Sequence, residues 1–257
     1  MAQLASGHAG QPGEAPSRRD RVRAATTDEI KLTARRILVA DGPDALSLRA
    51  IAREMGMTAP ALYRYFGSRE DLIGHVIADI FTEIAGDIQA AIGRAAATSG
   101  GDMTHKLVAA CHEFRRWSLD HRPEFGLLFG SPLPDLEAAL DGDDVIAACA
   151  MKFASTFFTL FLDLWQHHPF PVRPDSEIDQ GLRDQLARYR DSLGAELPLG
   201  AVFTFLWCWV RLYGMVSLEV FGHLHFALDD AAPMFEYTLS ELAAMVGLPY
   251  LPPAPGA

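Results

Sequence analysis

The sequence predicts an all-α fold in which three small helices precede a larger helical bundle. Apolar residues recur at the three- and four-residue spacing of a helix face through almost every segment between the two ends of the chain. No segment shows the sustained alternation of apolar and polar residues that marks a half-buried strand. Ser, Thr or Asp precedes several periodic segments and Gly or Pro follows them, as helix caps and stops require.

The two ends of the chain differ from this helical region in composition. Residues 1–25 are rich in Ala, Gly, Pro, Ser and Arg and lack an apolar period, so we expect a disordered arm with a basic end at residues 18–23. Residues 249–257 contain four prolines and are expected to form a frayed, Pro-rich tail.

The first predicted domain covers residues 26–72. A capping box at residues 26–29 opens its first helix, which ends at Asp41-Gly42-Pro43. Ser47 caps a second helix that ends at Gly56, and Thr58 caps a third that reaches about Tyr65. A second capping box at residues 68–71 starts a long helix that leads into the next domain.

The second predicted domain covers residues 73–248 and continues as a bundle. Its apolar periods predict further helices over residues 102–121, 124–129, 144–168, 176–193, 199–221 and 230–246. We find no internal repeat.

Charge is distributed unevenly between these domains. The net charge is −11, which argues against a generic nucleic-acid coat protein. Residues 1–70 carry 11 Lys or Arg and 8 Asp or Glu, whereas residues 71–257 carry 11 and 25. Only the N-terminal end is therefore expected to tolerate a polyanion.

The cysteines and the apolar runs predict a soluble, cytoplasmic protein. Cys111, Cys149 and Cys208 lie far apart in apolar, helix-like stretches, which suits buried thiols in a reducing compartment. The N-terminus lacks an apolar signal core. The longest uncharged apolar run, residues 197–210, is 14 residues long and too short to span a bilayer.

The sequence carries no recognisable catalytic or metal-binding motif. It has no Gly-x-Ser-x-Gly, no phosphate-binding Gly loop and no Cys-x-x-Cys, and its histidines lack the spacing of a metal site. We therefore expect no catalytic residue, no metal and no cofactor.

Residues 47–66 have the layout of a helix, a tight turn and a second helix. Ala52 is small enough for the next helix to pack closely, and Gly56 can adopt the positive φ that the turn needs. Apolar residues are expected to fill the space between the helices, and polar or basic groups fall on the opposite side. This is the layout of a helix-turn-helix, whose second helix enters the major groove of DNA, although an ordinary helical hairpin has the same spacing.

The residues in and after this stretch carry a family resemblance. Residues 62–72, LYRYFGSREDL, closely resemble the signature that follows the recognition helix in the TetR family of transcriptional regulators, and residues 48–58, LRAIAREMGMT, resemble its second helix and turn. The resemblance is specific over about residues 26–75. Residues 209–219 are similar to a C-terminal subgroup with a Trp, His and Gly motif, with Tyr213 in place of the usual His.

The start of the third helix is where base reading is expected. Ala59 and Ala61 offer only apolar contact, such as to a thymine methyl, and Ala59 stands where family members often have a longer polar residue. Arg69 matches the family's usual Lys, whereas Arg49 either reaches phosphate or lies on a solvated helix face. The basic end of the arm is either solvated or touches DNA. The predicted DNA-contacting residues are Ser47, Arg49, Thr58, Ala59, Pro60, Ala61, Tyr63, Arg64, Tyr65 and Arg69.

The second domain is rich in aromatic residues, which either fill a core or line the inducer pocket that the resemblance implies. Rings leave gaps more easily than aliphatic side chains, so the second interpretation predicts a small apolar effector. The predicted pocket residues are Phe114, Trp117, Phe125, Phe129, Phe153, Phe157, Phe161, Trp165 and Tyr213.

Two helices near the C-terminus are predicted to form a dimer interface. The helix over residues 199–221 is apolar on two faces, which indicates burial on both sides, and the last helix has an apolar stripe. Two such helices from each chain would form the four-helix dimer bundle that the resemblance also implies. The predicted interface residues are Phe203, Trp207, Val210, Gly214, Ser217, Phe235, Leu239 and Leu242.

Together these features favour a homodimeric, ligand-responsive transcriptional regulator of double-stranded DNA. We expect a repressor that binds a palindromic operator and is released by the effector, with the long helix from Ser68 as the lever; activators use the same parts. Two other classes stay open: an all-α enzyme with an apolar pocket, and a ligand-binding protein that does not act through DNA.

Overall fold

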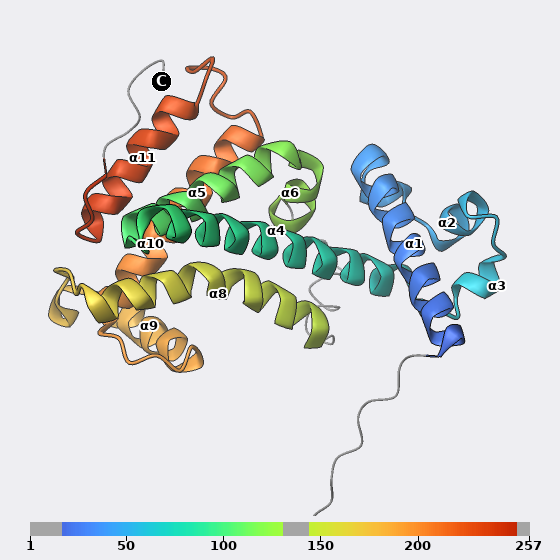
Figure 1. Ribbon diagram of the computed structural model, residues 1–257, viewed down its shortest axis with the longest axis horizontal. Coiled ribbons are helices and arrows are strands. Elements are labelled where there is room, and N and C mark those ends of the chain that lie inside the picture. The colour runs from blue at the N-terminus through green and yellow to red at the C-terminus, as the bar shows by residue number, and fades with distance from the viewer. Residues whose placement is uncertain (1–16, 131–143, 251–257) are drawn as a thin grey trace, which may run out of the picture. The chain divides into compact units, whose positions relative to one another are not determined.

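The computed structural model describes residues 17–130 and 144–250 of the chain. Within these ranges the protein consists of helices and contains no strand, which confirms the predicted all-α class (Figure 1). It divides into two compact units, residues 1–72 and 73–257.

The N-terminal unit is built from three helices and the first turn of a fourth. In chain order these are α1 (Arg18–Asp41), the 3₁₀ turn η1 (Pro43–Ala45), α2 (Leu48–Glu54), α3 (Ala59–Leu62) and the beginning of α4 (Arg69–Ser99). Apolar side chains from every helix meet in one core. Its buried members include Ile30, Ala34, Leu38, Leu46, Leu48, Ile51, Ala52, Leu62, Phe66 and Leu72.

Helix α1 begins at Arg18, eight residues before the predicted start, so the expectation of disorder is wrong for residues 18–25. Ser17 Oγ accepts from the N–H of Asp20 at 3.2 Å, and the Asp20 carboxylate accepts from the N–H of Ser17 at 3.2 Å, which forms a capping box. Thr26 and Thr27 do not cap, because their hydroxyls donate to the carbonyls of Val22 and Arg23 one turn earlier. The added turns are exposed and so lack an apolar period. Residues 1–16 lie outside the described ranges.

The capping at the start of α4 follows the prediction closely. Ser68 Oγ accepts from the N–H of Asp71 at 3.0 Å, and the Asp71 carboxylate accepts from the N–H of Gly67 at 2.7 Å. The pKa of Glu70 is lowered, first by the hydrogen bond from its own backbone N–H and then by Ser68 and Arg69. These carboxylates lie where the helix dipole favours negative charge.

The C-terminal unit is a bundle around α5 and α10. It contains the rest of α4, α5 (Met103–Asp120), α6 (Arg122–Phe129), α8 (Asp144–His167), the turn η2 (Asp175–Glu177), α9 (Gln180–Ser192), α10 (Leu199–Val220) and α11 (Ala232–Met245). Helix α5 packs against α6, α8, α10 and α11, and α10 also packs against α9 and α11. The predicted helices are all present, although α9 starts at Gln180, where Asp179 caps it by accepting from the N–H of Leu182.

Two of these helices are long and apolar enough to cross a membrane by length and composition alone. They are residues 148–167 of α8 and the whole of α10. Core helices of soluble proteins have the same properties. Helix α5 packs against both of these helices, and α9 and α11 also pack against α10.

The chain after α11 is held to the bundle as far as it is described. Leu248 N–H donates to the carbonyl of Ala243 at 2.9 Å, and the Tyr250 hydroxyl donates to Glu236 at 2.5 Å. Burial and this acceptor raise the pKa of Tyr250. The expectation that the frayed tail begins at residue 249 is therefore wrong for Pro249 and Tyr250, and residues 251–257 lie outside the described ranges.

Candidate functional site

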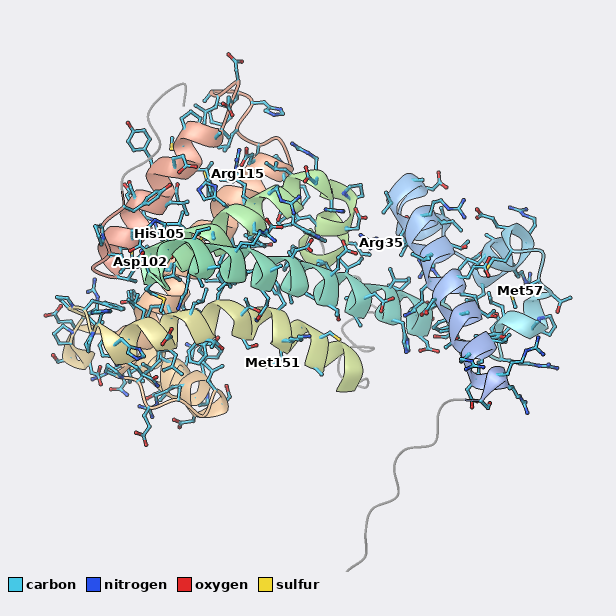
Figure 2. The ribbon with its side chains drawn as sticks, in the orientation of Figure 1. Arg35, Met57, Asp102, His105, Arg115 and Met151 are labelled. Atoms are coloured by element: carbon cyan, nitrogen blue, oxygen red, sulfur yellow. The ribbon has the colours of Figure 1, made fainter. Side chains whose placement is uncertain are left out.

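The turn between α2 and α3 is set by a glycine in the left-handed region. Gly56 has φ +64°, as the helix-turn-helix layout predicts. The N–H of Met57 donates to the carbonyl of Ala52 at 2.8 Å, and that of Gly56 donates to Arg53 at 3.3 Å. These bonds satisfy the last carbonyls of α2 and redirect the chain at once into α3. Met57 lies on this turn (Figure 2).

The two helices of this motif begin with different caps. Ser47 Oγ accepts from the N–H of Ala50 at 3.1 Å, as predicted. Thr58 occupies the same position before α3, but its side chain makes no capping hydrogen bond. Pro60 has no N–H to offer, and the N–H of Ala61 donates to the backbone carbonyl of Thr58 at 2.9 Å. The Thr58 side chain is therefore exposed and not used in capping.

Helix α3 ends at Leu62, three residues before the predicted end. Residues 63–65 form tighter turns, in which the N–H of Arg64 donates to Ala61 at 3.3 Å and that of Tyr65 donates to Leu62 at 2.9 Å. Leu62 and Phe66 anchor the segment in the core.

The predicted DNA-contacting residues divide by exposure. Those that lie on the surface are Ser47, Arg49, Thr58, Pro60, Tyr63 and Arg64, whereas Ala59, Ala61, Tyr65 and Arg69 are half-buried. The Tyr63 ring is 53% exposed although it is large and apolar. The α2–turn–α3 segment thus exposes hydroxyl, aromatic and basic groups.

Arg69 binds within the N-terminal unit. Its Nε donates to the carbonyl of Leu46 at 2.9 Å, and its Nη1 lies 3.4 Å from Glu70. This bond ties the start of α4 to the residue just before the cap of α2. Arg69 therefore helps to hold the motif together, and its contact with phosphate stays a prediction.

The sequence reasoning included Arg23 in the basic end of the arm but missed its contacts with the recognition segment. Its Nη2 donates to the backbone carbonyl of Arg64 at 3.1 Å, and its guanidinium lies 5.4 Å from the centroid of the Tyr65 ring. The prediction placed Arg23 in a disordered arm, whereas the longer α1 carries it to the end of the recognition segment. The capping box at Ser17 was the signal that could have revealed it.

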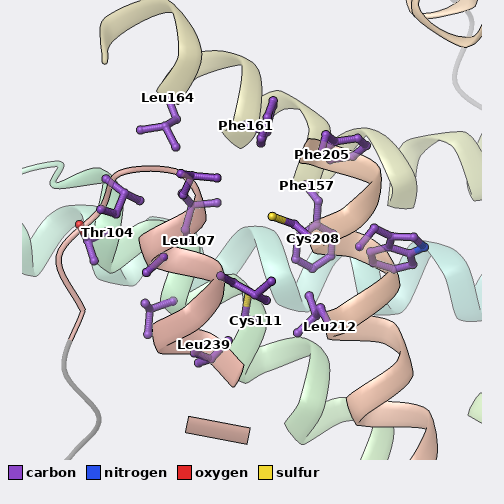
Figure 3. A pocket seen from close by; sticks show the side chains of 16 residues that line it. Thr104, Leu107, Cys111, Phe157, Phe161, Leu164, Phe205, Cys208, Leu212 and Leu239 are labelled. Carbon is purple, nitrogen blue, oxygen red and sulfur yellow. The ribbon is translucent and has the colours of Figure 1, made fainter. Parts of the chain in front are cut away.

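The C-terminal unit contains an apolar cavity of about 90 Å³ between α5, α8, α10 and α11 (Figure 3). Most of its wall is aliphatic and aromatic, with one hydroxyl and two thiols. The lining residues are Thr104, Leu107, Val108, Cys111, Phe157, Phe161, Leu164, Phe205, Cys208, Trp209, Leu212, Leu239, Leu242, Ala243, Val246 and Leu248.

Only Phe157 and Phe161 of the predicted pocket residues line this cavity. Phe114, Trp117 and Phe125 are completely buried and fill a core beside it. Ring contacts join that core to the other predicted residues: Phe114 lies 6.0 Å from Phe153, and Phe129 lies 5.6 Å from Tyr213, centroid to centroid. Trp165 packs edge-on against Phe170. These rings interlock with one another, so they fill space instead of bordering it.

The predicted dimer residues lie on two different faces. Trp207 and Val210 of α10 are 47% and 55% exposed, and Phe203, Gly214 and Ser217 are partly exposed. Phe235, Leu239 and Leu242 of α11 are buried within the bundle, and the two leucines line the cavity. The exposed apolar residues of α11 are instead Met234 and Tyr237. The register of α11 thus turns its apolar stripe toward its own chain.

Within residues 17–130 and 144–250 no group of three His, Cys, Asp or Glu side chains is placed to hold a metal ion. The ionisable side chains of the second unit mostly pair with each other. Arg115 makes two hydrogen bonds to Glu219, one of 2.7 Å and one of 2.5 Å, and these bonds raise the pKa of the guanidinium. Arg115 is labelled in Figure 2.

Comparison with known proteins matches both units to one family. The model described as "Bacterial regulatory proteins, tetR family" matches residues 32–76, and the one described as "Tetracyclin repressor-like, C-terminal domain" matches residues 107–242. The HTH-type transcriptional regulator Rv1816 of Mycobacterium tuberculosis is 29% identical over 188 residues, which are 73% of this chain and 77% of that protein. The regulator Mb1846 of Mycobacterium bovis matches to the same extent.

Solved structures show the same architecture. The crystal structure of SCO4313 has a TM-score of 0.68 and 31% identity, and the match covers 89% of this chain and all of that one. A protein of unknown function from Rhodococcus sp. RHA1, 18% identical, shares the fold with a TM-score of 0.52 over 92% of this chain and 97% of that one. With a helix-turn-helix in the first unit and a family match across the second, the chain belongs to the TetR family of DNA-binding transcriptional regulators.

Proposed function

We propose that this regulator is an effector-controlled repressor that binds a palindromic operator as a homodimer. The observation that carries the proposal is the exposure of Thr58, Tyr63 and Arg64 on the α2–turn–α3 segment, whose turn is formed at Gly56. A short recognition segment gives weak binding alone, and pairing two of them in a dimer raises affinity through effective concentration. Regulators of this family bind DNA and act as dimers, generally in the cytoplasm, where we place this one.

The outward face of α10 supports the choice of dimer interface. Trp207 and Val210 are exposed apolar residues on one helix, and Phe203 stacks on Trp207 with 6.1 Å between ring centroids. Met234 and Tyr237 add exposed apolar surface on α11, which packs against α10. Exposed apolar side chains that cluster on neighbouring helices favour a protein interface. We therefore assign the dimer seam to Phe203, Trp207, Val210, Gly214 and Ser217, with Met234 and Tyr237 from α11.

We assign effector binding to the apolar cavity. A ligand that prefers the conformation with low DNA affinity would release the operator, with a coupling of about 1–3 kcal/mol, or roughly 5–150-fold. In domain terms, residues 18–72 would read DNA and residues 73–248 would bind the effector and form the dimer. The lever would be α4, which begins in the first unit and continues in the second.

The DNA-reading role is tested on the DNA upstream of the protein's own coding sequence. The double variant Tyr63→Ala, Arg64→Ala is expected to bind that DNA at least tenfold more weakly, and its affinity should depend less steeply on salt because phosphate contacts are lost. Fluorescence anisotropy titrations at several salt concentrations measure both quantities. Arg188→Ala on α9 changes an arginine in the other unit and serves as the control.

Equal affinity and equal salt slope for wild type and the double variant would remove these residues from the interface. If wild type itself bound no DNA above the non-specific level, the alternative of a ligand-binding protein that does not act through DNA would replace the proposal.

Arg23 is expected to position the recognition segment without contacting phosphate itself. Arg23→Gln removes a hydrogen bond to Arg64 and a cation–π contact with Tyr65, so DNA affinity should fall by about 1–2 kcal/mol, or roughly 5–30-fold. The salt slope should stay that of wild type. Arg23→Lys keeps the charge but loses the planar guanidinium and should recover only part of the affinity. If Arg23→Gln reduced the slope of log affinity against log salt concentration by about one, and Arg23→Lys recovered both slope and affinity, Arg23 would instead contact phosphate directly.

A further inference from the structure

The walls of the apolar cavity carry no charged side chain. The polar side-chain groups of its lining residues are the hydroxyl of Thr104, the thiols of Cys111 and Cys208 and the indole N–H of Trp209, and the other lining side chains are hydrocarbon. The lining side chains converge from α5, α8, α10 and α11 (Figure 3). Side-chain hydrogen bonds to a ligand inside this space are therefore limited to these few groups.

The two thiols supply no charge at neutral pH. Burial, with a smaller contribution from the nearby Cys208, raises the pKa of Cys111 to about 12. Burial also raises the pKa of Cys208 to about 11. Both side chains are thus neutral, polarizable groups that suit contact with a ring. Phe157, Phe161 and Trp209 provide further ring contacts in the same wall.

Arg211 lies close enough to the cavity to act on the Cys208 thiol, but its guanidinium pairs with Glu241. Further charged groups surround one end of the cavity. A wider, open hollow shares Thr104 and Leu248 with the cavity, and the titratable groups that line it are Asp102, Lys106, Asp163, His167 and His168. This hollow lies at the N-terminus of α5 and the C-terminus of α8, and Figure 2 shows Asp102 and His105 at that end of α5. The shared residues make the hollow the natural entrance.

The charges at this entrance do not favour an anion. Lys106 Nζ lies 3.8 Å from Asp163 Oδ2, and His167 Nδ1 lies 3.0 Å from Asp163 Oδ1. Asp102 pairs with His105 at 2.7 Å, and the N–H of His105 together with its ring lowers the Asp102 pKa. The entrance thus has two carboxylates and one lysine.

We propose that the effector is an uncharged, ring-sized molecule that is mostly hydrocarbon and that enters between Thr104 and Leu248. Its few hydrogen bonds would go to Thr104, the thiols and the indole N–H of Trp209. The inference rests on the assignment of effector binding to this cavity and narrows its chemistry. A carboxylate in the cavity would lose its hydration and would meet no cation among the lining side chains, so we expect anionic analogues to be excluded. The cavity of about 90 Å³ is of the same order as the engineered cavity of ~150 Å³ that takes up benzene in another protein.

Three probes of equal ring size test this charge selectivity: bromobenzene, 4-bromophenol and 4-bromobenzoate. Bromine quenches tryptophan fluorescence at contact, and Trp209 lies in the cavity wall. We expect saturable quenching by the two neutral probes and at least about 100-fold weaker binding of the benzoate at pH 7. The variant Trp209→Phe should lose most of the quenching while calorimetry still detects binding.

Two variants locate the site and the entrance. Cys208→Phe fills the cavity and should abolish binding of bromobenzene, whereas Cys149→Met, a cysteine outside the cavity, should not. Thermal unfolding followed by circular dichroism establishes that Cys208→Phe is folded. Leu248→Trp narrows the entrance and should slow association and dissociation of the probe at least about tenfold each, with little change in equilibrium affinity.

The outcomes separate this inference from the proposed function. Equal binding of the benzoate and bromobenzene, or unchanged bromobenzene binding in folded Cys208→Phe, would overturn the inference. If the neutral probes bind as expected but DNA affinity stays the same with and without them, the ligand class stands and the regulatory role of the cavity fails. If only the benzoate releases DNA, the regulatory role stands and the ligand class fails.

Discussion

Replacing Phe114 by alanine is expected to lower the free energy of unfolding of the C-terminal unit by about 3–5 kcal/mol. Phe114 is completely buried on α5, and its ring lies within 6.3 Å of Phe125, Phe153, Phe157 and Trp209, centroid to centroid. Truncation leaves a cavity among rings that come from three other helices, α6, α8 and α10, and these cannot all move inward to close it. The melting temperature should fall by roughly 10 °C.

Denaturant titration followed by circular dichroism measures this loss at a fixed protein concentration. Phe226→Ala is the matched control, because it removes the same ring from a position that is 89% exposed, and it should change stability by less than about 0.5 kcal/mol. A loss below about 1 kcal/mol for Phe114→Ala would show that the aromatic residues border empty space, as the pocket interpretation of the sequence had it, and do not fill a core.

The variant Trp207→Asp is expected to dissociate the proposed dimer and to weaken operator binding by about 10²–10⁴-fold. The substitution places a carboxylate in an apolar seam, where it would be desolvated without a partner. Once the subunits separate, the two recognition segments no longer act at a shared effective concentration, and the gain in avidity is lost. Because Trp207 is 47% exposed in the single chain, the fold itself should survive.

Sedimentation velocity and anisotropy with operator DNA measure the two effects on one preparation. Met151→Asp on α8 is the control, since it introduces the same charge at an apolar side chain that is 60% exposed on the same unit. It should leave both assembly and DNA affinity unchanged. A Trp207→Asp protein that remains a dimer of wild-type strength would place the interface on another surface.

Much of the fold follows from interactions between neighbours in the sequence. The caps at Ser47 and Ser68 bond to N–H groups three residues away, and the turn at Gly56 depends on the φ of one residue. The same holds for the apolar periods that mark each helix. Such features are readable from the sequence because the residues that make them are only three or four positions apart.

The exceptions show where this local information ends. The first turns of α1 bury nothing, so no apolar period revealed them, and Arg23 was separated in the sequence from Arg64 by 41 positions. Thr58 is a good capping residue, but Pro60 has no N–H to donate to its side chain. The N–H of Ala61 donates to the backbone carbonyl of Thr58 instead. The correction at Thr58 comes from a competing backbone acceptor, which the sequence pattern does not take into account.

By itself, the sequence determined the all-α class, the helix order and the helix-turn-helix, because caps, stops and a single glycine define them locally. Only the tertiary structure decided which aromatic rings fill space and which border it. A cavity is a failure of close packing among α5, α8, α10 and α11, and its existence depends on the shapes of side chains that are more than 100 residues apart. The inward turn of Leu239 and Leu242 was likewise decided by how α11 packs on α5 and α10, since an apolar stripe shows that a helix face is buried but not what buries it.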